Sequence, residues 1–269
     1  MTSNPDGSAA RTPFHVYPLR FTAHPAAMIT FLRTLGLAPQ LTAGDGTFGE
    51  LHAGAGRVMV HSASGSEGGA RSGDTDLCLA VPDTMAAAAE LREAGLAVRT
   101  WDETYGKQGV VAGPAGESIG LNEDQEDTYG YEGHDPSGAD PRLEVVAVLS
   151  SDDFARDAAW FARFGFLPAG EGDEHWQALR GPGRAGTIGL HAPIAGDAGG
   201  RRTRGTGSEF GSSLQVRLGF ETSEDLEALA RRLADAGYAA HLVEGAPARS
   251  VHVTDPDGTV IEVHMSEGA

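Results

Sequence analysis

The feature that most constrains the fold is an internal repeat. Residues 28–39 read "MITFLRTLGLAP" and residues 157–168 read "DAAWFARFGFLP". Each segment has the pattern of an amphipathic helix, followed by a glycine between two apolar residues and then by a proline. Gly36 and Gly165 stand where a helix needs a C-terminal residue with positive φ. Because self-similarity at this length indicates repeated supersecondary units, the chain is predicted to contain two copies of one plan.

Two further pairs of segments support this prediction. Residues 86–98, "AAAAELREAGLAV", match residues 226–240, "LEALARRLADAGYAA", and each pattern predicts a helix that ends at a glycine. Residues 110–122, "VVAGPAGESIGLN", match residues 251–264, "VHVTDPDGTVIEVH", and each reads as a tight turn before a strand.

Four apolar segments open the repeated units. Their alternating or apolar pattern predicts strands at 14–21, 75–81, 143–149 and 213–220. Each is followed by a predicted helix and further strands, so the chain is predicted to form four βαβββ units of the α+β class, two units in each copy.

The repeat also predicts the domain boundaries. The acidic segment 123–141 is rich in Gly and Pro, which is typical of a linker. A Gly- and Arg-rich loop at 196–211 joins the two units of the second copy. The predicted division is a flexible tail at 1–13, a first domain at 14–122, the linker at 123–141 and a second domain at 142–266.

Composition narrows the location and the partners. No apolar run approaches the length of a membrane span, and the N-terminal residues lack the apolar core of a secretory signal. Cys78 is the only cysteine, which favours a cytoplasmic protein. The formal net charge of −18 disfavours binding to nucleic acid or to anionic membranes, and it would attract cationic ligands.

With these units, the sequence resembles the vicinal oxygen chelate superfamily, which includes glyoxalase I, bleomycin resistance proteins and extradiol dioxygenases. The most specific element is the closing "DPDGTVIE" hairpin, and the helix "DAAWFARFGF" comes next. The resemblance covers nearly the whole chain as two tandem domains. It implies that each domain is a U-shaped mixed sheet around a cup, in which a small molecule or a divalent metal is bound.

The resemblance places the metal ligands of this superfamily on three inward strand positions. In the second domain these positions fall on Val146, Arg217 and Glu262, and an arginine cannot donate a lone pair to a metal. We therefore expect an ion pair between Arg217 and Glu262, and no metal is favoured. A register shifted by two residues would instead give Glu144, Gln215 and Glu262, which keeps a divalent metal as an alternative.

The first domain matches the ligand pattern less well. Its positions fall on Tyr17, or on His15 in a shifted register, on Asp76 and on Gly120. Glycine has no ligand to offer, and Asn122 on the same predicted face is a weak metal ligand.

Two functions remain open from the sequence. The first is a small-molecule-binding protein without a catalytic metal, which holds a neutral or cationic aromatic ligand, as a monomer with paired domains or as a homodimer. The alternative is a glyoxalase- or dioxygenase-like enzyme that acts on a small organic substrate, with a divalent metal or with acid–base residues. The catalytic residues are not identified, and the candidates for lining the cups are Tyr17, Asp76, Asn122, Trp176, Arg217, Glu262 and His264.

Overall fold

The four predicted βαβββ units follow one another along the chain in the computed structural model. The structure describes residues 12–66, 68–103, 106–125, 128, 130–194, 202–208, 211–245 and 249–266. The first unit comprises β1 (His15–Val16), β2 (Leu19–Thr22), α1 (Pro25–Leu35), β3 (Ala38–Ala43), β4 (Phe48–His52) and β5 (Arg57–Ser62). After a 3-10 turn at Ala63–Gly65, the second comprises β6 (Thr75–Asp76), β7 (Cys78–Val81), α2 (Thr84–Glu93), β8 (Val98–Glu103), β9 (Gly106–Ala112) and β10 (Ser118–Glu123).

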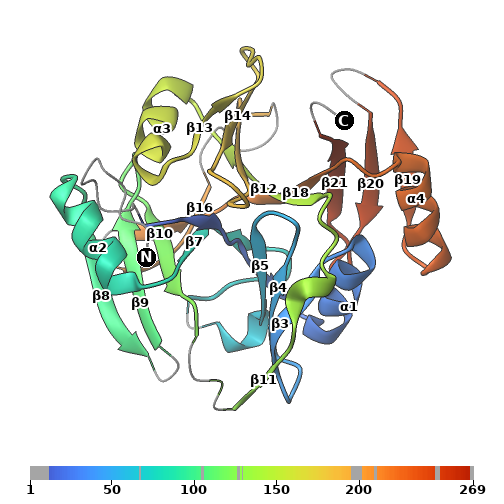
Figure 1. The fold of residues 1–269 in the computed structure, drawn as a ribbon, viewed down its shortest axis with the longest axis horizontal. Helices are drawn as coiled ribbons and strands as arrows, with labels where there is room; N and C mark the ends of the chain where they lie inside the picture. Colours follow the sequence, from blue (N-terminus) through green and yellow to red (C-terminus); the bar gives the residue numbers. More distant parts are fainter. Residues whose placement is uncertain are drawn as a thin grey trace, which may run out of the picture.

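The second half repeats this order (Figure 1). The third unit comprises β12 (Leu143–Ser150), α3 (Phe154–Phe161), a 3-10 turn (Ala162–Phe164), β13 (Leu167–Ala169), β14 (Trp176–Arg180) and β15 (Thr187–His191). The fourth comprises β18 (Arg217–Thr222), α4 (Leu226–Asp235), β19 (Ala240–Val243), β20 (Ser250–Thr254) and β21 (Val260–Met265). The predicted α+β class and the βαβββ units are confirmed.

The glycines that end the repeated helices adopt the predicted backbone conformation. The φ angles are 120° at Gly36, 79° at Gly95, 87° at Gly165 and 91° at Gly237. L-residues with a side chain rarely adopt positive φ, which explains why glycine stands at all four helix ends.

The second domain forms one eight-stranded sheet in the order β13-β14-β15-β12-β18-β21-β20-β19. In the first domain the two opening strands are each interrupted, so that β2 pairs with β6 and β1 pairs with β7. The same arrangement is therefore divided between two sheets, which contain the orders β3-β4-β5-β2-β6 and β1-β7-β10 with β9 and β8 beyond β10.

Segments that the sequence assigned to loops and linkers add strands to the first domain. In the segment 123–141, predicted as a linker, β11 (Tyr131–Gly133) pairs with β3. Within the predicted loop 196–211, the residues 196–201, 209 and 210 lie outside the described part of the chain, whereas β16 (Thr203–Ser208) pairs with β17 (Gly211–Leu214).

The predicted strand at 213–220 is divided between the two domains. Its first part, β17, lies parallel to β10 of the first domain at Ser118 and Ser213. Its second part, β18, lies antiparallel to β12 of the second domain. The chain therefore passes directly from one sheet into the other between Leu214 and Arg217.

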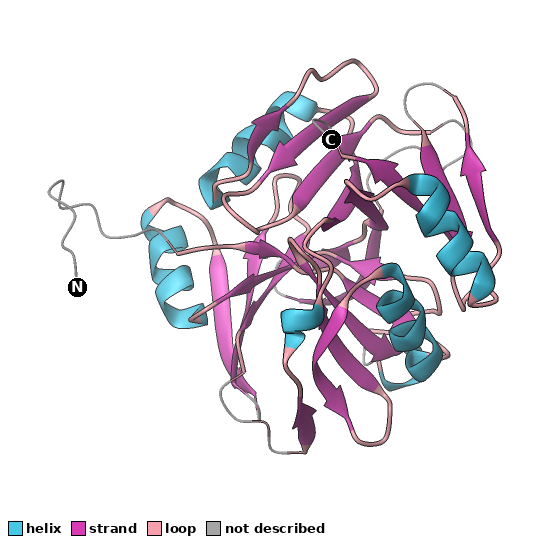
Figure 2. Ribbon diagram, turned by 45° about the vertical axis from the view of Figure 1, so that its right-hand side comes forward, coloured by secondary structure: helices cyan, strands magenta, loops and turns pink. Residues whose placement is uncertain are grey.

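The helices lie on the outer faces of the sheets, as Figure 2 shows. Most buried apolar residues of both domains belong to one continuous core, and a second, smaller cluster consists of Tyr17, Met59, Cys78 and Ala80. The rings of Phe14 and Phe164 meet edge to face across the domains at 5.0 Å between centroids, and those of Phe31 and Tyr238 do so at the same distance. Within the described residues, no helix is long and apolar enough to cross a membrane.

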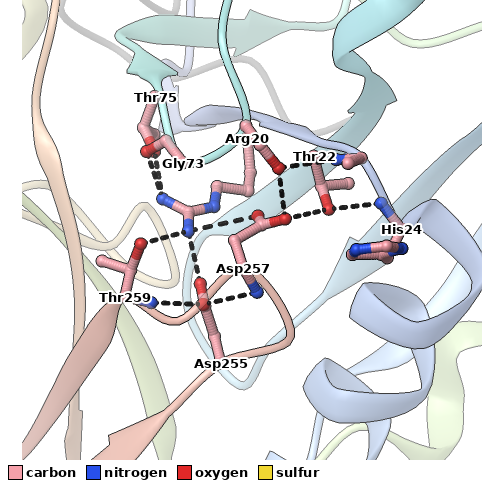
Figure 3. A network of polar contacts seen from close by, with 10 residues as sticks. Arg20, Thr22, His24, Gly73, Thr75, Asp255, Asp257 and Thr259 are labelled. Carbon is pink, nitrogen blue, oxygen red and sulfur yellow. Dashed lines mark hydrogen bonds and ion pairs between the residues drawn. The ribbon is translucent and has the colours of Figure 1, made fainter.

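The "DPDG" turn binds an arginine of the first domain (Figure 3). Arg20 on β2 is 2% exposed, and its guanidinium forms ion pairs with Asp255 and with Asp257, the latter at 3.4 Å. Asp255 also accepts hydrogen bonds of 2.9 Å from the backbone N–H groups of Asp257 and Thr259. Thr22 donates a hydrogen bond of 2.7 Å to Asp257. The "DPDG" turn, the most specific sequence mark of the resemblance, therefore also links the second domain to the first through Arg20.

Candidate functional site

The first-domain cup contains a cavity of about 1320 Å³. This volume exceeds the usual range of about 300–1,000 Å³ for small-molecule sites, so the cup has room for an organic molecule and water. Three sequence-predicted candidates, Tyr17, Asp76 and Asn122, meet in its lining. The aromatic side chains in the lining are those of Tyr17, Phe21, Phe48, Trp101 and Tyr131.

A buried carboxylate, that of Glu50 on β4, forms part of the cavity wall. Glu50 is 5% exposed, and its Oε1 lies 3.1 Å from Nε2 of His52 and 3.3 Å from Nη1 of Arg57. Arg57 also pairs with Asp124 at the surface. Since a buried carboxylate is costly unless it is paired, these partners explain how the charge is tolerated beside the cavity.

Tyr17, in the break between β1 and β2, lines the cavity together with Glu50. Burial, together with the negative charge of Glu50, raises the pKa of Tyr17 well above its usual value. The phenol therefore stays protonated at neutral pH.

Asp76 on β6 binds an arginine from the second half of the chain. Arg204 on β16 forms a bidentate ion pair with Asp76, in which Nε lies 3.2 Å from Oδ1 and Nη2 contacts Oδ2. The Arg204 guanidinium also lies 4.6 Å from the ring centroid of Phe21 and donates to the Gly68 carbonyl at 2.9 Å. Burial raises the pKa of Asp76, and Arg204 opposes that rise. The β16–β17 hairpin thus completes a wall of the first cup.

An imidazole also lines the cup, at the end of β5. Nδ1 of His61 lies 2.8 Å from the carbonyl oxygen of Ser62. A carbonyl can only accept, so Nδ1 carries the proton and Nε2 of the neutral ring is a potential base. His191 ends β15 in the equivalent place of the second domain, with Nδ1 at 2.6 Å from the carbonyl of Ala192.

Gly120 occupies the third ligand position of the first domain. The side chain of Cys78 takes up the space that a side chain at Gly120 would need. A Cβ at Gly120 would lie 2.7 Å from Sγ of Cys78, so the close approach of β7 and β10 requires glycine. Burial, with the charge of Asp76, raises the pKa of the Cys78 thiol to about 12. Cys78 is therefore a poor nucleophile at neutral pH.

The predicted ion pair between Arg217 and Glu262 is not formed, and both residues belong to the described part of the chain. β18 and β21 are parallel with Phe220 beside Val263, a register that puts Gly219 rather than Arg217 next to Glu262. Glu262 instead lies 2.9 Å from Nε2 of His264. This hydrogen bond is the main reason why the pKa of Glu262 is lowered.

The remaining candidates in the second domain are separated. Trp176 on β14 covers Gly189, and its ring lies 6.2 Å from that of His191. Glu144 accepts a hydrogen bond from Thr187 and lies 3.6 Å from Nε of Arg180.

The alternative ligand set also includes Gln215, which lies in an isolated β-bridge with Asp76 of the first domain. Across the described residues, no group of three or more His, Cys, Asp and Glu side chains could hold a metal ion. The residues that the structure describes therefore do not fit the divalent metal that the resemblance implies.

Sequence reasoning missed Glu50 and Arg204 as parts of the site. The alternation of apolar and polar residues along 48–52 could have placed Glu50 on an inward face, but the sequence does not reveal that this face borders a cavity. No sequence pattern marks Arg204 as part of the site, because it follows a glycine-rich loop and contacts a residue 128 positions earlier.

No protein-family model and no curated protein matches the sequence. Comparison of structures does find similar proteins. The 2,3-dioxygenase LapB from Pseudomonas sp. KL28 has a TM-score of 0.58 at 15% identity, with 95% of this chain and 92% of that chain covered. A catechol 2,3-dioxygenase has a TM-score of 0.59 at 13% identity, with 96% of this chain and 89% of the other covered.

A third similar structure is that of the Mn(II)-bound glyoxalase from Novosphingobium aromaticivorans. Its TM-score is 0.56 at 15% identity, with 95% of this chain and 81% of that chain covered. Because these alignments span nearly the whole chain, the resemblance predicted from the sequence is confirmed at the level of the fold. The chain has the vicinal oxygen chelate fold, in the two-domain form of the extradiol dioxygenases.

Proposed function

We propose that this protein is an enzyme that binds a small organic molecule in the first-domain cup and moves a proton on it with acid–base residues. The observation that carries the proposal is the large cavity with a carboxylate, that of Glu50, and an imidazole, that of His61, in its lining. These residues lie on adjacent strands, since Glu50 is the cross-strand partner of Met59, two residues before His61.

The two groups take different roles in this proposal. His61 acts as the general base through Nε2, because its Nδ1–H is held by the Ser62 carbonyl. Glu50 hydrogen-bonds a polar group of the substrate, oriented by His52 and Arg57. The substrate gives its proton to His61 and receives it back at another atom, so the chemistry is proton transfer within one molecule.

The aromatic lining supports a planar substrate. Rings such as those of Phe48 and Trp101 favour stacking with an aromatic ligand, and carboxylates in the wall favour a neutral or cationic one. The catechol 2,3-dioxygenase among the structural neighbours is named for a small aromatic compound. We propose this substrate class together with a cytoplasmic location.

A second candidate function is binding without turnover. Two observations favour it: the raised pKa of Cys78 removes a nucleophile from the cup, and the raised pKa of Tyr17 disfavours a phenolate base. A protein of this kind would sequester its ligand.

The test begins with a thermal-shift screen of catechols, aromatic antibiotics and 2-oxo aldehydes. Compounds that stabilise the protein are then incubated with it in D2O, and deuterium incorporation at acidic C–H positions is followed by NMR. We expect exchange with the wild-type protein and with His191→Gln, the matched control in the second domain. His61→Gln should bind the same compound and lose exchange.

The outcomes separate the two functions. Binding without exchange by the wild-type protein would reject the enzyme and leave the sequestering protein. Exchange that survives in His61→Gln would reject the assigned base. If the thermal shift caused by each compound is unchanged in a Phe48→Ala variant, the compounds do not bind in the cup. The proposed site would then be wrong.

A further inference from the structure

Two histidines lie side by side on the outermost strands of the second domain. β19 is the edge strand of the eight-stranded sheet, and β20 is its neighbour (Figure 1). In the antiparallel register of these strands, His241 is the direct partner of His252. Cross-strand partners have their Cβ atoms about 4.5–5.5 Å apart, so the two side chains leave the same face of the sheet at close range.

This face lies opposite α4. Val251 and Val253, on either side of His252, are buried in the core together with the leucines of α4. Successive side chains along a strand point to opposite faces, so His252 and its partner His241 point away from the helix. His241 is exposed and His252 is half-buried, so ions from solvent reach the pair from the His241 side.

The spacing of the two rings suits a shared metal ion. Their centroids lie 5.8 Å apart, and their planes are inclined by 55°. With metal–nitrogen bonds of about 2.0–2.1 Å, two imidazoles on one ion hold their centroids roughly 4.5–6.5 Å apart, depending on the angle at the metal. Both rings could therefore bind one ion without a shift of the strands.

Neither ring is committed to another polar group. Among the described residues, the imidazoles of His241 and His252 have no hydrogen-bond or ion-pair partner. By contrast, Nδ1 of His61 and Nδ1 of His191 each lie against a backbone carbonyl. Because a neutral imidazole has one acceptor nitrogen, His241 and His252 each keep a lone pair available.

A carboxylate next to the pair favours a cation. Glu262 on β21 is the direct cross-strand partner of His252. Its hydrogen bond of 2.9 Å goes to His264, so Glu262 contributes charge here rather than a ligand. The net charge of −18 on the whole chain acts in the same direction.

We propose that His241 and His252 form a binding site for a divalent transition metal ion of the class of Cu²⁺, Ni²⁺ and Zn²⁺. Imidazole nitrogen is a preferred ligand of these ions, and Cu²⁺ should bind most tightly. Two protein ligands leave the remaining positions to water, in keeping with the lack of any suitable group of three or more His, Cys, Asp and Glu in the described ranges. The site shares no residue with the ligand positions of the superfamily at Val146, Arg217 and Glu262, and it is independent of the first-domain cup.

The test is calorimetric titration of the full chain, without a polyhistidine tag and after treatment with a chelator, with nickel chloride and separately with zinc chloride. We expect one saturable site, which His241→Gln and His252→Gln each weaken by at least about tenfold. The double variant should lose little more than either single variant, because one remaining imidazole no longer chelates the ion. His24→Gln is the matched control, since His24 is an exposed histidine of the first domain.

Electron paramagnetic resonance of the protein loaded with one equivalent of Cu²⁺ identifies the ligands. The wild-type spectrum should show coupling to two imidazole nitrogens, and the spectrum of His252→Gln should show coupling to one. Because His241 is exposed, His241→Gln should leave the unfolding midpoint without metal unchanged, which separates loss of binding from loss of folding.

Three results would overturn the proposal. They are the absence of saturable binding, equal weakening by His24→Gln, and losses in the two single variants that add up in the double variant. Binding that Glu262→Gln abolishes and His241→Gln leaves intact would place the ion at the ligand position of the superfamily, and it would overturn the proposal as well.

Discussion

Replacing Arg20 with methionine should destabilise the protein strongly. The Arg20 side chain is 2% exposed and that of Asp255 is 0% exposed, so the change leaves a carboxylate buried without its counter-ion. Breaking a buried ion pair by removal of one partner costs about 3–5 kcal/mol. For a chain of this size, that loss corresponds to a fall in melting temperature of roughly 10 °C.

The assay is urea denaturation followed by circular dichroism, with Arg163→Gln as a control for the lost charge. The double variant Arg20→Met/Asp255→Asn should recover about 1–2 kcal/mol of the loss, because it removes the stranded charge together with the arginine. A loss below about 1 kcal/mol in Arg20→Met, or a double variant less stable than Arg20→Met alone, would contradict this prediction.

The loss should also depend on pH in a defined direction. Burial raises the pKa of Asp255 in the folded protein, and Arg20 opposes that rise. A raised folded-state pKa gives stability that is complete below the ordinary value of about 3.9 and is lost as the pH rises through the folded-state pKa. Without Arg20 the pKa of Asp255 rises further, so the difference from wild type should be largest at neutral pH and shrink on acidification.

Three other predictions test the sites directly. His264→Ala should raise the pKa of Glu262, since the hydrogen bond from His264 is the main factor that lowers it, and carboxyl NMR titration would detect the change. Gly120→Ala should lower the unfolding free energy by about 1–3 kcal/mol, because the new Cβ would meet Sγ of Cys78 at 2.7 Å; Gly138→Ala, where nothing lies within 4 Å, is the control in denaturant titrations. Cys78, buried and with its pKa raised to about 12, should resist a thiol reagent at pH 8 in the folded protein and react fully in denaturant, and fast labelling of the native protein would contradict this.

The parts of the fold that were predictable are those with a local signal. The helices α1 (Pro25–Leu35) and α4 (Leu226–Asp235) carry an amphipathic pattern and are followed by a glycine, and both marks depend only on neighbouring residues. The turn at 255–258 was equally readable from its Pro and Gly. Repetition of these signals along the chain was enough to indicate the tandem fold.

The interactions that needed tertiary contacts were not predictable. The ion pair between Arg217 and Glu262 depended on strand register, and a shift of two residues along β18 replaces Arg217 with Gly219 as the neighbour of Glu262. The partners of Asp76 and Asp255 lie 128 and 235 positions away along the chain. No local pattern marks such pairs, so the composition of the candidate site had to come from the structure.

The passage of the chain from one sheet into the other at Leu214–Arg217 has a consequence for dissection of the protein. The backbone N–H of Leu77 donates to the carbonyl of Leu214, and that of Val216 donates to Thr75. A fragment that ends at residue 141 would lack these bonds and the guanidinium that neutralises Asp76. Its unpaired strand edge would invite self-association. The two halves should accordingly melt in one cooperative transition, and neither should survive limited proteolysis as a separate soluble piece.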